Sequence, residues 1–272
     1  MSELALFIQK AILEQRKLLA IYLTTSFPRA EWTVPLGQAI LQAGADLIEL
    51  GFPFSDPLAD GPTIQHASTI ALSAGFKRQQ IFTAASVLSK AAPVLIMGYL
   101  NSVLSAGNEQ FLADCKASGV SGLIVPDLPI DENEELWNNG ERDGVPLIPF
   151  VSPTTPATRI QQIDAIGAPF VYAVSLAGVT GARSALGPEV VKYVYQVKAQ
   201  MNSPILVGFG VSSATSAAQL AADADGVIVG SAIIERIQRA SSLQDAISSV
   251  GTFVAELRGA LDHVSQQKVT SC

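Results

Sequence analysis

Cysteine and histidine are scarce in this chain of 272 residues, which contains two of each. Cys115 and Cys272 are too few for a disulfide framework, so we expect a reducing, cytoplasmic setting. His66 and His263 lie far apart in the sequence, without the spacing of a metal-ligand cluster. These residues therefore give no reason to expect a zinc site.

Long apolar runs and blocks of basic residues are also missing. No run approaches the roughly 20 apolar residues that cross a bilayer, and the first residues lack the pattern of a secretory signal. Charged residues make up only 15% of the chain and the net charge is −7, which argues against nucleic acid as a ligand. Hydrophobic residues make up 49%, which indicates a large folded core.

What the chain does contain is a regular alternation of short apolar runs with longer segments of helical period. Nearly continuous apolar runs rich in β-branched residues are typical of parallel strands in a sheet covered on both faces. We expect strands at 18–25, 47–52, 94–99, 122–127, 147–151, 170–175, 205–210 and 226–231. We expect helices at 3–16, 34–43, 81–90, 109–118, 131–139, 157–166, 189–200, 214–222 and 247–264.

Eight strand–helix units in a chain of this length predict a single α/β domain over residues 1–272, a (β/α)8 TIM barrel with an extra N-terminal helix. The alternative is a doubly wound open sheet, which would place a glycine-rich turn after the first strand. The turn at 24–28 reads TTSFP and contains no glycine. In a barrel the active site lies at the carboxyl ends of the strands, so residues scattered along the chain would gather on one rim.

Two acidic residues stand out against this pattern. Glu49 interrupts the apolar run at 47–52, where a carboxylate is costly unless it has a use, and Asp60 follows in a loop rich in proline and glycine. Carboxyl groups at a strand end and on the next loop are placed for proton transfer and charge stabilisation. The plain alternative is a salt-bridged Glu49 and an Asp60 that caps a helix.

Glycine follows the predicted strands in the last three units. Gly208 and Gly210 end the seventh strand, Gly230 and Ser231 end the eighth, and the loop at 176–187 contains the run GVTG. Backbone N–H groups beside glycine can approach an anion closely, and a helix N-terminus favours negative charge, so the three loops indicate a phosphorylated ligand. The alternatives are helix entries with nothing bound and, for 176–187, either a lid or an ordinary surface connection.

The segment 49–63 resembles the signature of the tryptophan synthase alpha subunit family. Its core reads ELGFPFSDPLADGP, a run too long to match by chance. The resemblance continues in MGYLN at 97–101, PDLP at 126–129, GVTG at 178–181, GFG at 208–210 and GSA at 230–232. It therefore covers most of the chain, in order and with the spacing of a barrel.

The resemblance implies a lyase that cleaves indole-3-glycerol phosphate to indole and glyceraldehyde 3-phosphate by a retro-aldol step, late in L-tryptophan biosynthesis and without metal or organic cofactor. It implies Glu49 as the catalytic acid/base and Asp60 as a second catalytic carboxylate. It implies the tryptophan synthase beta subunit as the partner in an alpha2-beta2 tetramer, with Asp56 and Pro57 in the contact region. The positions that hold substrate, most of them around its phosphate, are Tyr172, Gly181, Gly208, Gly210, Gly230 and Ser231.

The residues fit this chemistry on their own terms. Breaking the bond at indole C3 requires one proton delivered to that carbon and another removed from a glycerol hydroxyl, and one carboxyl with a raised pKa can do both. The apolar neighbours of Glu49 would raise its pKa, and Asp60 could stabilise positive charge at the ring nitrogen. Candidates to line the ring pocket, each also explained as a core residue, are Tyr22, Leu100, Leu128 and Phe209.

Three residues depart from the family's pattern. Ser26 and Asp223 stand where the family usually has glycine, and Leu176 stands where some members carry arginine. None of the three touches the two carboxyl groups. The departures leave lid closure and signalling to the partner open, more than the chemistry.

Other functions stay open from the sequence alone. A metal-dependent sugar-phosphate epimerase would need His and Asp ligands, and an indole-glycerol-phosphate synthase would use a lysine acid at a strand end, whereas the lysines here fall in predicted helices and loops. The chain could also be a non-catalytic barrel that activates a partner, although intact Glu49 and Asp60 speak against it. A stand-alone lyase that releases indole is a further alternative within the family.

Overall fold

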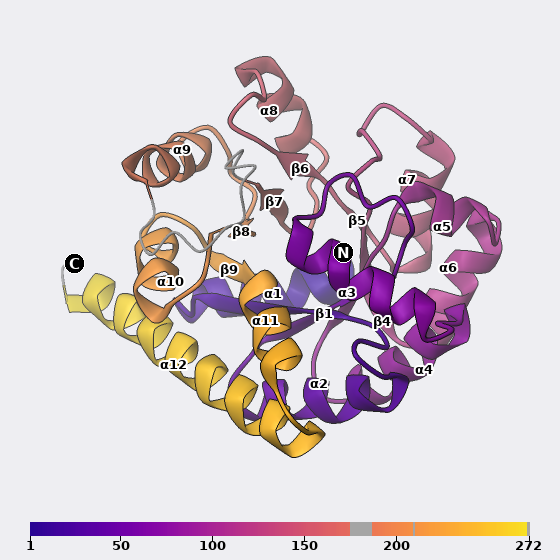
Figure 1. Cartoon of the computed structure of the whole chain (residues 1–272). Coiled ribbons are helices and arrows are strands. Elements are labelled where there is room, and N and C mark those ends of the chain that lie inside the picture. Colours follow the sequence, from indigo (N-terminus) through magenta and orange to yellow (C-terminus); the bar gives the residue numbers. More distant parts are fainter. Residues whose placement is uncertain (175–186, 209, 271–272) are drawn as a thin grey trace.

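The protein forms a barrel of parallel strands wrapped by helices, as Figure 1 shows. The computed structural model describes residues 1–174, 187–208 and 210–270, with the backbone alone at 267–270. Its strands are β1 (Leu18–Thr24), β2 (Leu47–Gly51), β3 (Val94–Met97), β4 (Val120–Ile124), β5 (Leu147–Ile148), β6 (Phe150–Val151), β7 (Val171–Ala173), β8 (Ile205–Val207) and β9 (Gly226–Val229). Its helices are α1 (Glu3–Leu13), α2 (Thr33–Gln42), α3 (Pro62–Ser73), α4 (Arg78–Leu88), α5 (Leu100–Leu104), α6 (Asn108–Ala117), α7 (Glu134–Asp143), α8 (Ala157–Asp164), α9 (Pro188–Lys198), α10 (Ala214–Ala221), α11 (Ser231–Arg239) and α12 (Leu243–Thr270), with a short 3-10 helix η1 (Ala30–Trp32).

Closure of the barrel depends on the fifth predicted strand, which is interrupted at Pro149. The segments on either side are β5, which pairs with β4, and β6, which pairs with β7. Proline has no N–H to donate, but the Pro149 carbonyl still accepts a hydrogen bond from the Tyr172 N–H at 2.9 Å. The nine segments therefore follow the order β5-β4-β3-β2-β1-β9-β8-β7-β6 and make the eight strands of a (β/α)8 barrel, which confirms the predicted fold.

One end of the barrel is filled by α1. The Ser2 side chain caps this helix by accepting the Ala5 N–H, and apolar residues spaced along it face inward. Leu4 and Ile8 pack inside the barrel with Leu18, at the start of β1. The helix predicted at 3–16 thus exists and covers the end at which the strands begin, so the carboxyl ends of the strands remain for a site.

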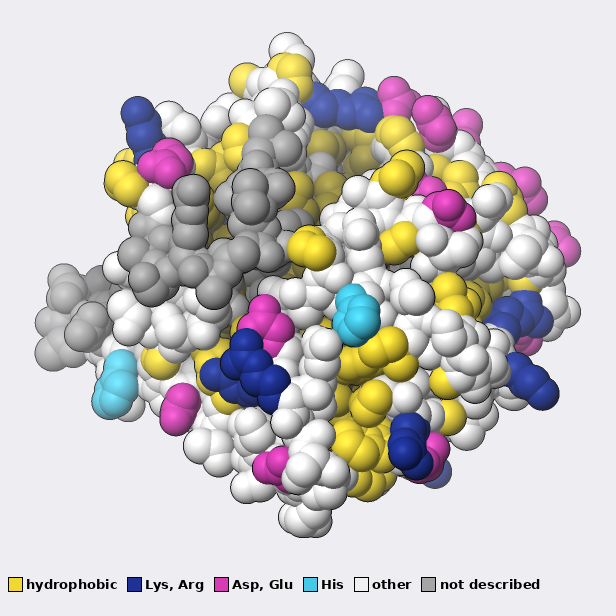
Figure 2. Space-filling view, in the orientation of Figure 1, with side chains coloured by type: hydrophobic (Ala, Val, Ile, Leu, Met, Phe, Trp, Pro, Cys, Tyr) yellow, Lys and Arg dark blue, Asp and Glu magenta, His cyan; other side chains and the backbone are white. Residues whose placement is uncertain are grey.

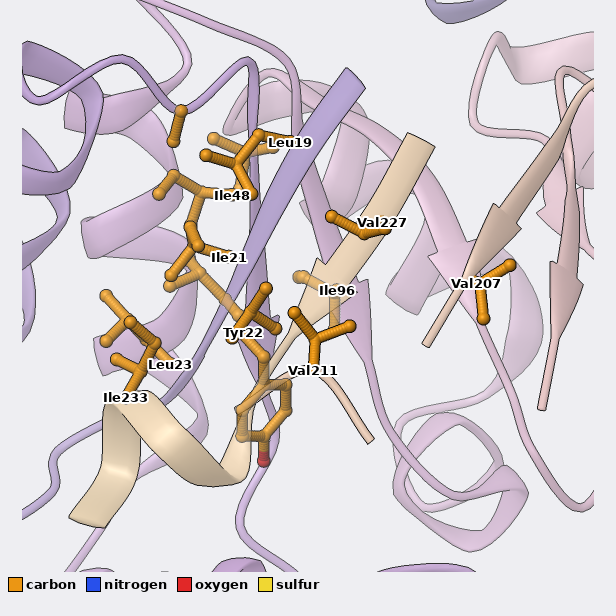
Figure 3. Packing of buried hydrophobic residues seen from close by; sticks show 14 of the residues in the cluster. Leu19, Ile21, Tyr22, Leu23, Ile48, Ile96, Val207, Val211, Val227 and Ile233 are labelled. Carbon is orange, nitrogen blue, oxygen red and sulfur yellow. The ribbon is translucent and has the colours of Figure 1, made fainter. Parts of the chain in front are cut away.

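The larger cluster of buried side chains lies between the strands and the helices around them. Leu19, Ile21 and Leu23 alternate along β1 and belong to this cluster. Figure 3 shows that the Tyr22 side chain leaves the strand in a different direction from these three. Ile233 packs in the same cluster, where α11 contacts β1. The pleat of β1 therefore directs Tyr22, a buried member of the same cluster, away from the three residues that pack against the helices.

Some elements differ from those that the sequence predicts. The periodicity gives no range for α3 or α5, because each begins inside or directly after a loop that contains glycine or proline. The helix expected after Gly230 and Ser231 is α11. The last helix is longer than predicted, since α12 continues to Thr270. No helix in the described part of the chain is long and apolar enough to cross a membrane.

Candidate active site

A cavity of about 580 Å³ lies at the carboxyl ends of the strands. Figure 2 views the molecule in the same orientation as Figure 1 and shows hydrophobic side chains deep in a recess in the upper half of this face. The cavity brings together many of the predicted site residues, namely Tyr22, Glu49, Asp60, Tyr172, Gly208, Gly210, Gly230 and Ser231. Its other walls include apolar side chains that sequence reasoning missed, namely Leu58, Ile64, Met97, Phe150, Val174, Val211 and Ile228.

Glu49 lies in the middle of β2, between Tyr22 of β1 and Leu95 of β3 in the strand register. Its side chain is 2% exposed, and neither carboxyl oxygen has a hydrogen-bond partner among the described residues. Burial, with a smaller contribution from the charge of Asp60, raises the pKa of Glu49 to about 8. Among the described residues Glu49 has no ion-pair partner, which speaks against the salt-bridged alternative. Near neutral pH this carboxyl holds a proton that it can donate into the cavity.

Asp60 faces the same cavity from the loop between β2 and α3. Its backbone N–H donates to the Pro57 carbonyl at 3.1 Å, and its own carbonyl accepts from the Gln65 amide at 2.9 Å. Burial raises the pKa of Asp60 to about 6, and a hydrogen bond with the Tyr99 side chain opposes that rise. The helix-cap alternative is wrong, since Gly61 is the N-cap of α3 and no side chain caps that end.

The two carboxyl groups therefore have different protonation states near neutral pH. Asp60, with a pKa of about 6, is mostly ionised, whereas Glu49, with a pKa of about 8, is mostly protonated. Two carboxyls whose environments separate their pKa values can serve as a proton donor and a fixed negative charge in one site.

Two tyrosine rings form walls of the cavity, and glycines make room for both. A Cβ on Gly51 would lie 2.1 Å from the Tyr22 hydroxyl oxygen, and a Cβ on Gly208 would lie 2.1 Å from the Tyr172 ring. The Tyr172 ring also stacks on Phe150, with centroids 4.9 Å apart. Glycine at 208 is thus required by a neighbouring ring, independently of any phosphate.

The opposite wall offers backbone amides at the start of α11. Gly230 is the N-cap of this helix and Ser231 its first residue, and no side chain caps the end. The first N–H groups of a helix lack partners inside it, so these amides are available to an anion. The N-terminus of α10 differs, because the Ser216 hydroxyl accepts the N–H groups of Ser212 and Ser213, both at 3.1 Å. No lysine or arginine lines the described part of the cavity.

Several predicted residues do not lie on the described cavity wall. Leu100, the first residue of α5, and Leu128 pack in the hydrophobic cluster around the barrel and are absent from the lining, so their assignment to the ring pocket is corrected. Gly181 and Phe209 lie outside the described residues, as does most of the predicted lid at 176–187.

The predicted partner-contact residues and two of the family departures lie away from the cavity lining. Asp56 is exposed on the loop that carries Asp60, and Pro57 is next to it. Ser26 has a φ of +65°, the left-handed conformation that favours glycine, and its N–H donates to the Thr33 hydroxyl at 2.9 Å. Asp223 lies in the turn before β9, and Leu176 is outside the described residues.

A (β/α)8 barrel with an acid, a separate carboxylate and a helix N-terminus around one apolar cavity defines an enzyme of acid–base chemistry on an anionic, partly apolar substrate. The family of tryptophan synthase alpha chains matches residues 8–262 of this protein. The alpha chain of Chloroflexus aggregans is 44% identical over 246 residues, which cover 89% of this chain and 92% of that relative. The alpha chain of Thermoanaerobacter sp. (strain X514) is 40% identical over 250 residues, 91% of this chain and 95% of the relative.

Solved structures agree with the sequence comparison. A tryptophan synthase alpha chain from Legionella pneumophila subsp. pneumophila superimposes with a TM-score of 0.88 at 34% identity, covering 97% of this chain and 98% of that one. A chain from Mycobacterium tuberculosis tryptophan synthase gives a TM-score of 0.85 at 36% identity, covering 96% and 98%. The chain belongs to the tryptophan synthase alpha chain family, lyase subunits that cleave indole-3-glycerol phosphate to indole and glyceraldehyde 3-phosphate in tryptophan biosynthesis and pair with a beta subunit.

Proposed function

We propose that Glu49 moves both protons when this chain cleaves indole-3-glycerol phosphate. The protonated carboxyl donates to indole C3, and the resulting carboxylate takes the proton of the hydroxyl on the carbon attached to the ring. The electron pair of the breaking carbon–carbon bond moves into the ring, and that hydroxyl carbon becomes the aldehyde of glyceraldehyde 3-phosphate. One proton enters and one leaves, so Glu49 returns to its starting state.

Asp60 supplies the fixed negative charge in this proposal. Protonation at C3 places positive charge on the ring nitrogen, and an ionised carboxylate beside the ring N–H stabilises that charge in an apolar cavity. The observation that supports both roles is the pair of pKa values, about 8 for Glu49 and about 6 for Asp60, on groups that face one cavity.

The substrate's two ends fit the two kinds of wall. We place the indole ring among Tyr22, Met97, Phe150 and Ile228, where apolar side chains dominate. We place the phosphate at the amides of Gly230 and Ser231, beside Gly210, with Tyr172 and Gly208 next to it. Gly181 and Phe209 keep their proposed places at the phosphate and the ring, on the strength of the family resemblance.

The partner in this proposal is a tryptophan synthase beta subunit, in an alpha2-beta2 tetramer in the cytoplasm. Asp56 and Pro57 would meet it, because the loop that carries them projects from the same rim as the cavity. A beta subunit that contacts this loop would also affect Asp60, which belongs to the same loop. The partner could therefore accelerate cleavage by favouring one position of that carboxylate.

Indole release from indole-3-glycerol phosphate by the purified chain, titrated with beta subunit, tests the proposal. We expect slow release by the chain alone and a rise of about 5–150-fold at saturation, the usual size of allosteric coupling. Equal rates with and without beta subunit would identify a stand-alone lyase. No release in either condition, while the beta subunit's own reaction is still stimulated, would identify a non-catalytic activator and refute the roles of Glu49 and Asp60.

A further inference from the structure

The loop between β2 and α3 carries Asp60, and in the described part of the chain few hydrogen bonds tie it to the barrel, among them those of the Gln65 amide to the Pro57 and Asp60 carbonyls. Leu58 at its tip is 93% exposed, and Ser55 and Asp56 are exposed as well. Its hydrogen bonds at Leu58 and Asp60 close turns within the loop itself. A group with a catalytic role on such a segment needs a tie to the rigid part of the fold.

Tyr99, two residues after β3, provides that tie. The Tyr99 hydroxyl accepts the Ala59 N–H at 2.9 Å, directly before Asp60 in the chain. This places the hydroxyl beside the Asp60 carboxyl, whose pKa it lowers. Its ring stacks on Phe54 near the start of the same loop, with centroids 5.2 Å apart and planes 22° apart. One side chain therefore holds both ends of the loop. Tyr99 does so from behind, since it is 5% exposed and is not among the cavity-lining residues.

Tyr99 is itself held in place. It is the N-cap residue of α5, and the next N–H, that of Leu100, donates to the Asp127 carboxylate at 2.8 Å. Asp127 follows β4, so this bond joins the segment after β3 to the segment after the next strand. The hydroxyl that meets the loop is thus fixed to two strands of the barrel.

We propose that Tyr99 is a positioning residue that holds Asp60 against the cavity, by accepting the Ala59 N–H and donating its own proton to the Asp60 carboxylate. The proposal rests on the role of Asp60 in the proposed function. Tyr99 does not need to touch the substrate, because it acts through Asp60 alone.

A donor aimed at a carboxylate favours the ionised form. Among the described residues, the other titratable side chains whose charge reaches Asp60 are Glu49 of β2, Tyr22 of β1 and Tyr172 of β7. All are acids that disfavour the charge on Asp60 when they ionise, so within this described set Tyr99 works in the opposite direction. Loss of the Tyr99 hydroxyl should therefore raise the pKa of Asp60, and activity that requires its ionised form should begin to fall at a higher pH.

The test is Tyr99→Phe, which keeps the ring stack on Phe54 and removes only the hydroxyl. We expect kcat to fall about tenfold, KM to change by less than about threefold, and the acidic limb of the kcat–pH profile to move up by about half a unit to one unit, the size of one lost charge-assisted hydrogen bond. Tyr193→Phe is the matched control, because Tyr193 is a buried tyrosine of α9 whose hydroxyl has no partner among the described residues. It should leave all three quantities unchanged.

Two further variants make the outcome decisive. Asp127→Asn weakens the support of Tyr99 without touching the loop, and it should move the acidic limb in the same direction by less. In an Asp60→Asn background, Tyr99→Phe should have no further effect on kcat, since the residue acts through Asp60. An unmoved acidic limb in Tyr99→Phe, or a full further loss on top of Asp60→Asn, would overturn the positioning role alone. Full activity of Asp60→Asn by itself would instead overturn the proposed function.

Discussion

Glu49 and Asp60 face one cavity from supports of very different rigidity. Glu49 is part of a strand with paired neighbours on both sides, and the backbone around it is buried. Asp60 is on a loop with an exposed tip, tied to the barrel through Tyr99. The pairing of the strands therefore fixes the position of the proton donor, Glu49. A few hydrogen bonds fix the position of the negative charge, Asp60. The part of the site that a partner can adjust is therefore the loop.

The substitution expected to lower the rate of indole release most is Glu49→Gln, in the rigid strand of the site. Glutamine keeps the shape of the side chain but carries no transferable proton, so the rate of indole release should fall by about 10²–10⁴-fold. Steady-state assays of indole release check this, with Glu135→Gln on the exposed face of α7 as a control that should behave as the unmodified chain. Activity of Glu49→Gln within about tenfold of the unmodified chain would contradict the assigned role.

The same substitution should change how stability depends on pH. The pKa of Glu49 is about 8 in the folded chain and near 4.5 when unfolded, so the folded state binds the proton more tightly. Its contribution to stability is therefore complete below about pH 4.5 and is lost as the pH rises to about 8, by on the order of 5 kcal/mol.

Denaturant unfolding at pH 5 and pH 8.5 measures this contribution. Glu49→Gln should lose less stability than the unmodified chain across the interval, because glutamine does not titrate. An identical pH dependence of the free energy of unfolding in both chains would show that Glu49 titrates normally.

Asp60→Asn, on the loop between β2 and α3, should lower activity less than Glu49→Gln does. Asparagine still accepts a hydrogen bond but carries no charge, so we expect a loss of roughly 10–100-fold in kcat, with the acidic limb near pH 6 abolished. Asp143→Asn, at the last residue of α7, is the matched control, because Asp143 is not among the residues that line the cavity. If Asp60→Asn kept its acidic limb, another group would be responsible for it.

The backbone amides at the start of α11 can be tested by a substitution that has little effect on folding. Among the described residues, a Cβ on Gly230 would meet no atom closer than 3.5 Å, and its φ of −118° suits any residue. Gly230→Ala should therefore fold normally and raise KM roughly tenfold, by disturbing hydrogen bonds to a charged group. Gly259→Ala in α12, where a Cβ also meets open space, provides the control. An unchanged KM in Gly230→Ala would show that the phosphate does not bind at these amides.

The sequence predicts the barrel well because each strand is a short apolar run that ends in glycine, proline or a polar residue. It also singles out Glu49 and Asp60, since a carboxylate in an apolar strand and one on the next loop are visible in a single chain. Both carboxyl groups prove to face the same cavity.

The apolar walls were harder to predict. In a sheet covered on both faces, inward and outward residues are equally apolar, so Met97, Phe150 and Ile228 carry no mark of facing the cavity. Leu100 and Leu128 are equally apolar in the sequence, yet they pack in the cluster around the barrel. The break at Pro149 and the tie through Tyr99 depend on contacts between strands, which the sequence does not display.

The most direct test of the account is the pKa of the Glu49 carboxyl itself. A carbon-13 NMR titration of the side-chain carboxyl groups, compared between the unmodified chain and Glu49→Gln, identifies the resonance that belongs to Glu49. We expect its midpoint near pH 8, well above the value of 4.5 for an ordinary glutamate side chain. A midpoint near 4.5 would show a carboxylate that is already ionised at neutral pH, and would contradict its role as the proton donor.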